Sequence, residues 1–215
     1  MNSPFNLENQ TEYTNWREYK LSQYPTNNEK LLVKFHKNVI SKSDVNLIKE
    51  SIKKYNFAFY EFESVVPDKE LHKFCSKLGL EKSISNLLSD ADNISNITNQ
   101  KGNRDKISGK EYIPYTDKRL NWHTDGYYYP IDSAIKSFLL HCVNPAKNGG
   151  ENFLLDHEII YIHLRDYNPD FIDVLMQNNI MEIPKNKNVE GSKNVSGPVF
   201  YICLLYTSPS PRDAT

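Results

Sequence analysis

The middle of the chain carries the stretch Asn121-Trp122-His123-Thr124-Asp125-Gly126-Tyr127-Tyr128-Tyr129-Pro130. On an extended strand, residues i and i+2 point to the same face, so His123 and Asp125 would present an imidazole and a carboxylate side by side. These are two of the three groups of the 2-His-1-carboxylate triad, which binds Fe(II) and leaves positions open for other ligands. The alternative is that Asp125 and Gly126 form a turn and that His123 is an ordinary strand histidine.

The segments that follow the triplet form an ordered series of predicted elements. Residues 135–143 have an unbroken apolar core and are typical of a strand, and a turn-rich loop with paired glycines follows. Residues 151–155 are predicted to be a second short strand. Asp156 is predicted to cap a helix that runs through Leu164, and Pro169 to stand at the start of the next helix.

With these elements in place, residues 112–176 resemble the TauD/TfdA-like Fe(II)- and 2-oxoglutarate-dependent dioxygenases. The resemblance rests on His-Thr-Asp, Tyr-Tyr, Leu-Leu-His-Cys, Gly-Gly-Glu and a later Asp, in this order and spacing. Within that family these motifs are most similar to those of the γ-butyrobetaine and trimethyllysine hydroxylase branch. The zinc-binding cysteine cluster of some members of that branch is absent from the sequence, which has only Cys75, Cys142 and Cys203.

The resemblance implies a fold that is mainly β with flanking helices (α+β), namely a double-stranded β-helix or jelly roll, incomplete at its C-terminus. It implies Fe(II) and the cosubstrate 2-oxoglutarate, with O2 and a small-molecule substrate as partners. The enzyme would decarboxylate 2-oxoglutarate to succinate and CO2 and hydroxylate a C–H bond of a small polar molecule. By the same resemblance, His123 and Asp125 are metal ligands. Asn152 contacts 2-oxoglutarate, at a position after the paired glycines Gly149 and Gly150 where the family commonly has threonine.

The second histidine of the triad and a basic partner for the cosubstrate lie far downstream in this family. The histidines that follow the triplet are His141, His157 and His163. The first lies at a strand position that the family does not use for a ligand, and the other two fall on a predicted helix. Arg165 is also helical and Arg212 is in the extreme tail. We therefore expect the distal histidine and arginine to be missing from this chain.

The tail suggests a reason for that gap. Residues 204–215 resemble translated sequencing-adapter sequence, and the alternative is a disordered Ser/Pro-rich tail. We expect one oxygenase domain over residues 1–203, cut before its last strands, followed by a non-native tail over 204–215. The chain would then be a catalytically silent fragment, or a small-ligand binding module that lacks the complete metal site.

Composition narrows the class of protein. A chain of 215 residues suits one domain, and a formal net charge of −1 argues against general affinity for nucleic acid. The sequence has no apolar run of membrane-spanning length, and its N-terminus lacks the basic start and apolar core of a signal peptide. Three cysteines without close spacing fit a reducing compartment, so we expect a cytoplasmic protein. Oligomeric state and substrate identity do not follow from the sequence.

The N-terminal part alternates predicted helices with short strands. Hydrophobic periodicity predicts helices over 12–20 and 69–78, and strands over 31–35 and 57–60. Ser43 or Asp44 is predicted to cap a further helix, Gly79 to end the helix over 69–78, and Cys75 to pack in the core. Weaker strand patterns cover 94–98 and 199–202.

Five tyrosines cluster around the triplet in sequence: Tyr112, Tyr115, Tyr127, Tyr128 and Tyr129. Aromatic faces attract cations, so together with the branch resemblance a trimethylammonium substrate is one hypothesis. Strand packing is the other interpretation, because tyrosine favours half-buried sheets. A sulfonate or carboxylate substrate also suits the family. A zinc-dependent hydrolase that uses the His/Asp pair is a further interpretation of the motif.

Overall fold

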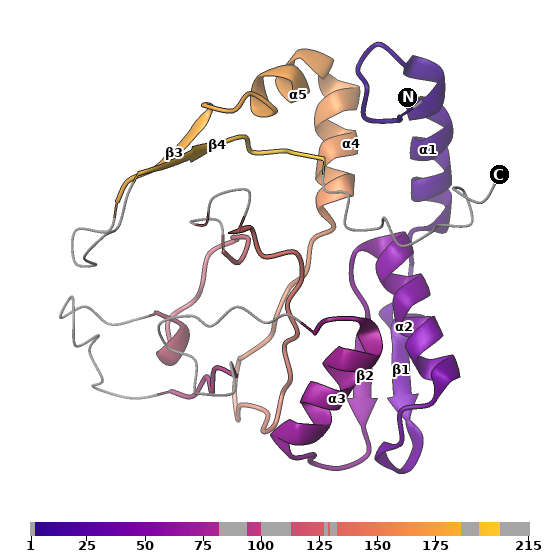
Figure 1. Cartoon of the computed structure of the whole chain (residues 1–215), viewed down its shortest axis with the longest axis vertical. Coiled ribbons are helices and arrows are strands. Elements are labelled where there is room, and N and C mark those ends of the chain that lie inside the picture. The colour runs from indigo at the N-terminus through magenta and orange to yellow at the C-terminus, as the bar shows by residue number, and fades with distance from the viewer. Residues whose placement is uncertain are drawn as a thin grey trace. The chain divides into compact units, whose positions relative to one another are not determined.

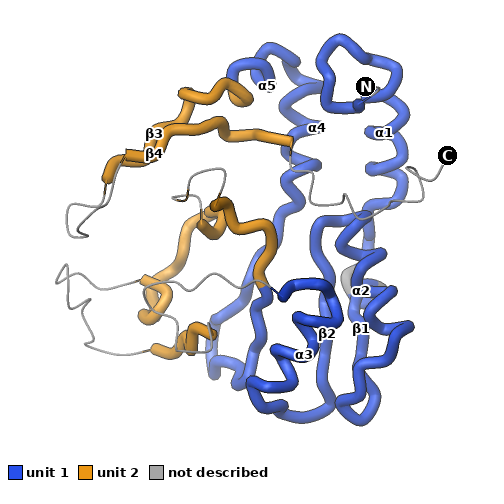
Figure 2. The backbone as a smooth tube through the Cα atoms, in the orientation of Figure 1, with its two compact units in different colours: residues 1–81, 139–174 blue, residues 82–138, 175–215 orange. Residues whose placement is uncertain are grey.

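The computed structural model describes residues 3–81, 94–99, 113–126, 129, 133–185 and 194–202. The chain divides into two compact units, residues 1–81 with 139–174 and residues 82–138 with 175–215 (Figure 2). Each unit therefore combines two separate segments of the chain. Several sequence-based predictions fall outside the described residues, namely those for Tyr112, Tyr127, Tyr128, Cys203, Arg212 and the tail over 204–215. In the described ranges, no helix is both long and apolar enough to cross a membrane.

The N-terminal segment of the first unit is a helix followed by a β-α-β arrangement and a further helix (Figure 1). Its elements are α1 (Gln10–Gln23), η1 (Asn28–Leu31), β1 (Leu32–Phe35), η2 (His36–Asn38), α2 (Lys42–Tyr55), β2 (Phe59–Phe62) and α3 (Asp68–Leu78). β1 and β2 pair in parallel, with Leu32 opposite Phe59 and Phe35 opposite Phe62. Parallel neighbours need a crossover connection, which α2 provides. The helices and strands predicted here are confirmed, with shifted ends.

The core of this unit is shared by the sheet, α2 and α3. Its buried members are Val33, Phe35, Ile40, Val45, Ile48 and Phe74. Phe35 and Phe74 are almost fully buried, and their rings meet edge to face with centroids 5.2 Å apart. Such aromatic pairs stabilise a core beyond the burial of their area, so this pair anchors the sheet to α3. Leu139, from the second segment of the unit, packs against the same cluster.

The first turns and last turns of these helices follow ordinary capping chemistry. Ser41 is the N-cap of α2: its hydroxyl accepts from the Asp44 N–H, and the Asp44 carboxylate accepts from the Ser41 N–H at 2.9 Å. The prediction of Ser43 or Asp44 as the cap is therefore wrong, because Asp44 closes a capping box from the third helical position. α3 ends at Gly79 in the left-handed conformation, as predicted. Cys75 is half-buried and burial raises the pKa of its thiol, in keeping with a packing role.

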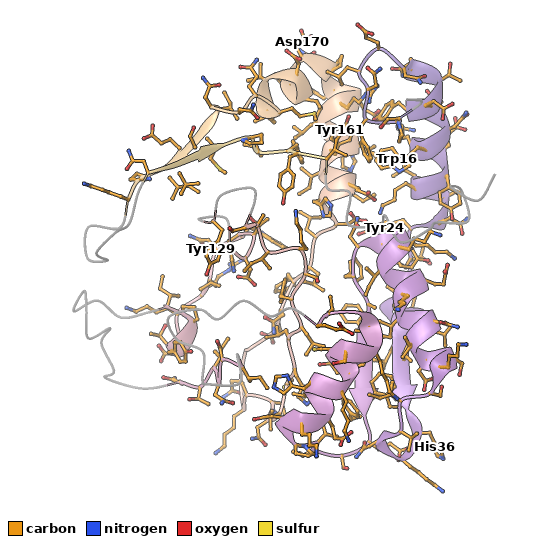
Figure 3. The ribbon with its side chains drawn as sticks, viewed as in Figure 1. Trp16, Tyr24, His36, Tyr129, Tyr161 and Asp170 are labelled. Atoms are coloured by element: carbon orange, nitrogen blue, oxygen red, sulfur yellow. The ribbon has the colours of Figure 1, made fainter. Side chains whose placement is uncertain are left out.

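The second segment of the first unit supplies α4 (His157–Tyr167) and most of α5 (Pro169–Leu175). Asp156 is the N-cap of α4, and its carboxylate accepts from the Glu158 N–H, so the predicted cap is confirmed. α4 lies alongside α1, where the ring of Trp16 meets the ring of Tyr161 edge to face at 6.1 Å (Figure 3). The two helices thus share an aromatic contact between segments far apart in sequence.

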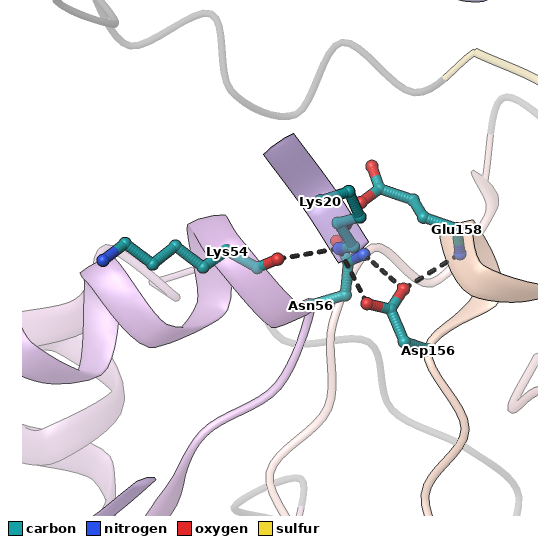
Figure 4. Close-up of polar contacts among 5 residues, drawn as sticks. All are labelled: Lys20, Lys54, Asn56, Asp156 and Glu158. Carbon is teal, nitrogen blue, oxygen red and sulfur yellow. Dashed lines mark hydrogen bonds and ion pairs between the residues drawn. The ribbon is translucent and has the colours of Figure 1, made fainter. Parts of the chain in front are cut away.

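A buried ion pair joins the ends of α1, α2 and α4 (Figure 4). The Lys20 ammonium lies 2.7 Å from the Asp156 carboxylate, and both side chains are almost completely buried. Lys20 also pairs with the Glu158 carboxylate and donates to the Lys54 carbonyl at 2.7 Å. The other Asp156 oxygen accepts from the Asn56 side chain at 2.8 Å and from the Glu158 N–H at 2.9 Å. Because buried charges persist only when paired and hydrogen-bonded, this network holds the three helix ends together.

The second unit contains η3 (Ile113–Tyr115) and the antiparallel strands β3 (Met181–Ile183) and β4 (Val195–Gly197) in its described part. Met181 lies opposite Gly197 and Ile183 opposite Val195. The sequence analysis did not predict this pair.

Several predicted strands are not strands in the described residues. No strand is assigned over 94–98, 135–143, 151–155 or 199–202. A strand needs a neighbouring backbone for its hydrogen bonds, which apolar periodicity does not supply, and in these segments Phe138, Leu140 and Phe153 remain exposed. The described part of the chain therefore consists of helices and two small sheets, and the double-stranded β-helix stays a prediction.

Candidate functional site

His123 and Asp125 lie in the second unit, on backbone that is not assigned as a strand. The extended strand predicted for them is wrong, because Asp125 and Gly126 form a turn and Gly126 has a φ of +71°. The two side chains nevertheless lie next to each other, with His123 Nε2 3.5 Å from Asp125 Oδ1. Both are exposed to solvent. The juxtaposition inferred from the triplet is therefore confirmed, although a turn produces it.

The hydrogen bond on the other ring nitrogen determines what His123 offers to a ligand. Its Nδ1 lies 2.7 Å from the backbone carbonyl oxygen of Asn121. A carbonyl oxygen only accepts, so Nδ1 carries a proton and Nε2 is the ring nitrogen that faces Asp125. Histidines that bind metals usually donate their other N–H to a carbonyl or carboxylate in this way, which fixes the tautomer.

The pair has the charge and spacing of two metal ligands. His123 Nε2 and Asp125 Oδ1, 3.5 Å apart, are a nitrogen and an oxygen that could both donate to one cation. Neighbouring ligands of an octahedral ion, each about 2.1 Å from it, stand about 3 Å apart. In the described residues, no group of three His, Cys, Asp or Glu side chains is placed to bind a metal, so a third ligand is not identified.

Asn152 lies in the first unit, beyond a tight turn at the paired glycines. Gly149 and Gly150 have φ values of +69° and +84°, a region that favours glycine. The Asn152 amide donates to the Gly150 carbonyl at 3.3 Å. The residue also lines a pocket of about 280 Å³, together with Tyr24, Pro25, Phe57, Phe59, Phe153 and Leu154. Its role toward 2-oxoglutarate stays a prediction.

The remaining candidate ligands occupy structural or exposed positions. His157 and His163 lie on α4, as predicted, and both are exposed. Arg165 is buried and donates to the carbonyl oxygens of Pro4, Asn6 and Leu7 and to the Tyr161 hydroxyl. Its guanidinium therefore fastens the N-terminal segment to α4.

A second group of polar side chains was not recognised in the sequence. The rings of Tyr60 and His141 stack with centroids 5.7 Å apart, and the Tyr60 hydroxyl lies 3.2 Å from His141 Nδ1. They line a pocket of about 410 Å³ within the first unit, together with Phe62, Leu140 and Cys142. Burial raises the pKa of Tyr60 and lowers the pKa of His141. The alternation that turns Leu139 and His141 toward β2 was the available signal in the sequence.

His141→Gln is expected to remove a pH-dependent part of the stability of the fold. The pKa of His141 is lowered below its ordinary value of 6.5 by burial, against an opposing effect of the Asp68 charge. The unfolded chain therefore binds more protons as pH falls below that value, and stability present above it is lost on acidification. Denaturant unfolding gives the free energy of unfolding at about pH 7.5 and at about pH 5. Its decrease between these two pH values should be larger in the wild type than in His141→Gln. An equal loss in both proteins would contradict this assignment.

The predicted tyrosine cage is described only at Tyr115 and Tyr129, so a trimethylammonium site stays a prediction.

Comparison with known proteins places the chain in a family. A uridine-5'-phosphate dioxygenase of Streptomyces sp is 37% identical over 87 residues, which make up 40% of this chain and 31% of that protein. The match thus spans less than a third of the length of this curated relative. No solved structure matches the chain. A model of the family described as taurine catabolism dioxygenase TauD, TfdA family matches residues 22–202, and the chain therefore belongs to this family, as its resemblance predicted.

Proposed function

We propose that the protein is an Fe(II)- and 2-oxoglutarate-dependent dioxygenase that hydroxylates a small polar molecule. The observation that carries this proposal is the His123–Asp125 pair, with its 3.5 Å spacing and with His123 Nδ1 occupied by a carbonyl. Membership in a family of dioxygenases supports it. A double-stranded β-helix over residues 1–203, a non-native tail over 204–215 and a cytoplasmic location belong to the same proposal.

The residues of the pair have distinct roles in this proposal. His123 Nε2 and the Asp125 carboxylate hold the iron, and the Asn121 carbonyl keeps the His123 proton on Nδ1. Asn152 hydrogen-bonds to 2-oxoglutarate through its amide. The bound iron, with 2-oxoglutarate and O2, supplies the oxidising power for C–H hydroxylation. The carboxylate of Asp125 lowers the net charge of the site, so the divalent cation is favoured there.

Besides the sulfonates and carboxylates that the resemblance also suits, two substrate classes have support of their own. A trimethylammonium compound is supported by the tyrosines near the triplet and by the branch resemblance. A nucleotide is supported by the relative, whose name describes a dioxygenase of uridine-5'-phosphate. Succinate release from 2-oxoglutarate in the presence of each compound would distinguish them.

A second candidate function is a small-ligand binding module, or a silent fragment, that keeps the scaffold without turnover. It is favoured by the metal-ligand set, since only two candidate ligands lie together in the part of the chain that the structure describes. A zinc hydrolase would instead be activated by Zn(II) without 2-oxoglutarate.

Anaerobic titration of the full chain with Fe(II) in the presence of 2-oxoglutarate tests the proposal. The expected result is a weak visible charge-transfer band from the chelated complex, which requires that iron and cosubstrate bind at one site. Circular dichroism confirms in parallel that the chain is folded. A folded chain that produces no band at saturating iron would overturn the proposed activity for this chain and favour the binding module.

A further inference from the structure

We infer that Gly126 and Ile135 are positioning residues, whose contact sets the Asp125 carboxylate beside His123. This inference rests on the proposed function, because it assigns the contact a role at the proposed metal site. It concerns only residues of the second unit.

The turn after Asp125 is anchored at Gly126. In the stretch over residues 121–126, Gly126 is the buried residue and the others are exposed. Its φ of +71° is in the left-handed region, which side chains other than glycine rarely adopt. Its carbonyl also accepts from the Tyr129 N–H at 2.9 Å, so the backbone is held on its far side as well.

Ile135 occupies the space that a side chain at position 126 would need. A Cβ added to Gly126 would lie 2.6 Å from Ile135 Cδ1 and 2.7 Å from its Cγ1. Carbon atoms pack at about 3.5–4.0 Å, so relief requires a shift of about 1 Å. The shift must be taken by Ile135 or by the backbone that carries Asp125.

A displacement of that size matters for a pair of ligands. His123 Nε2 and Asp125 Oδ1 lie 3.5 Å apart, and their spacing depends on the short backbone that joins Asp125 to Gly126. Functional groups need positioning to within about 0.5 Å, and a misplacement of about 1 Å is costly. Because Gly126 has no side chain, the turn can pack directly against Ile135, and this contact fixes the backbone position that carries Asp125.

The first test measures Co(II) affinity from its visible absorption in the full chain. Gly126→Ala is expected to weaken binding by about tenfold or more, and adding Ile135→Ala to recover most of that loss, because it removes Cδ1 and Cγ1 and leaves only the Ile135 Cβ at 3.2 Å. Gly126→Asn separates the two causes, since asparagine tolerates the left-handed region but brings the same Cβ. It should therefore bind as weakly as Gly126→Ala, and Ile135→Ala should rescue it equally.

Gly79→Ala is the matched control. Gly79 has a φ of +87°, but a Cβ there meets nothing within 4 Å. It should lose stability and keep wild-type Co(II) affinity. Unchanged affinity in Gly126→Ala, or a double variant as weak as Gly126→Ala, would overturn the inference.

A second test needs no metal. In the metal-free wild type, a nuclear Overhauser effect is expected between the Gly126 Hα protons and the Ile135 δ1 methyl. The His123 ring resonances should move in Gly126→Ala and return in the double variant. Absence of either effect refutes the positioning role. If both effects are found but the wild type binds neither Co(II) nor Fe(II), the proposed function fails and the contact stands.

Discussion

His123→Ala and Asp125→Ala are each expected to abolish the charge-transfer band and to weaken Fe(II) binding by more than about 100-fold. Loss of an outer hydrogen-bonding partner of a metal ligand already costs about 10–100-fold in affinity, so loss of a ligand costs more. The two variants remove different groups, an imidazole nitrogen and a carboxylate oxygen, from a pair only 3.5 Å apart. Anaerobic Fe(II) titration with 2-oxoglutarate measures both effects.

The matched control for the first variant is His163→Ala, which removes an exposed histidine from α4. It should bind iron as the wild type does. Asp125→Asn keeps the shape of the side chain and removes its charge, so it should also lose the band. Retention of the band in either alanine variant would show that iron binds elsewhere and that the pair is not its site.

Asp156→Ala is expected to destabilise the first unit by about 3–5 kcal/mol, because it takes the buried carboxylate from the buried Lys20 ammonium and leaves the more exposed Glu158 as its charged partner. Lys20 is almost completely buried and lies 2.7 Å from the Asp156 carboxylate. The same substitution removes the acceptor for the Asn56 amide and the cap of α4. Urea unfolding followed by far-UV circular dichroism should show an earlier midpoint.

The exposed pair Lys34–Glu61 provides the comparison, with N···O at 3.0 Å and side chains 70% and 50% exposed. Glu61→Ala should cost no more than about 1 kcal/mol, since exposed pairs contribute little. The double variant Lys20→Met with Asp156→Leu should recover much of the lost stability by replacing both charges with apolar groups. A midpoint for Asp156→Ala close to that of Glu61→Ala would contradict a structural role for the buried pair.

Local chemistry explains which predictions the structure confirmed. Asp156 was recognised as a cap because its type and its place before an apolar-periodic segment are a local signal. Its pairing with Lys20 was not predicted, since a contact between distant segments leaves no periodic trace. The same reasoning applies to residues 135–143: their apolar run does not identify a pairing strand, and Phe138 and Leu140 are exposed in the structure.

The sequence was sufficient to predict which residues form the candidate site, but it predicted only part of their geometry. The types and spacing of His123 and Asp125 were sufficient to infer that their side chains meet. The turn at Gly126 was the alternative interpretation of the same residues, and its left-handed φ explains how a turn can replace a strand. The group that orients His123 is the backbone carbonyl of Asn121. Every residue has such a carbonyl, so the residue types in the sequence could not predict this contact.

The discontinuity of the first unit has a consequence for synthesis on the ribosome. Lys20 precedes Asp156 by 136 residues. Residues 82–138, the first segment of the second unit, are translated between them. At about 5–20 residues translated per second, Asp156 is made roughly 7–27 s after Lys20. Until α4 is translated, Lys20 lacks both of its carboxylate partners, so the buried ion pair of the first unit can form only after Asp156 and Glu158 are made.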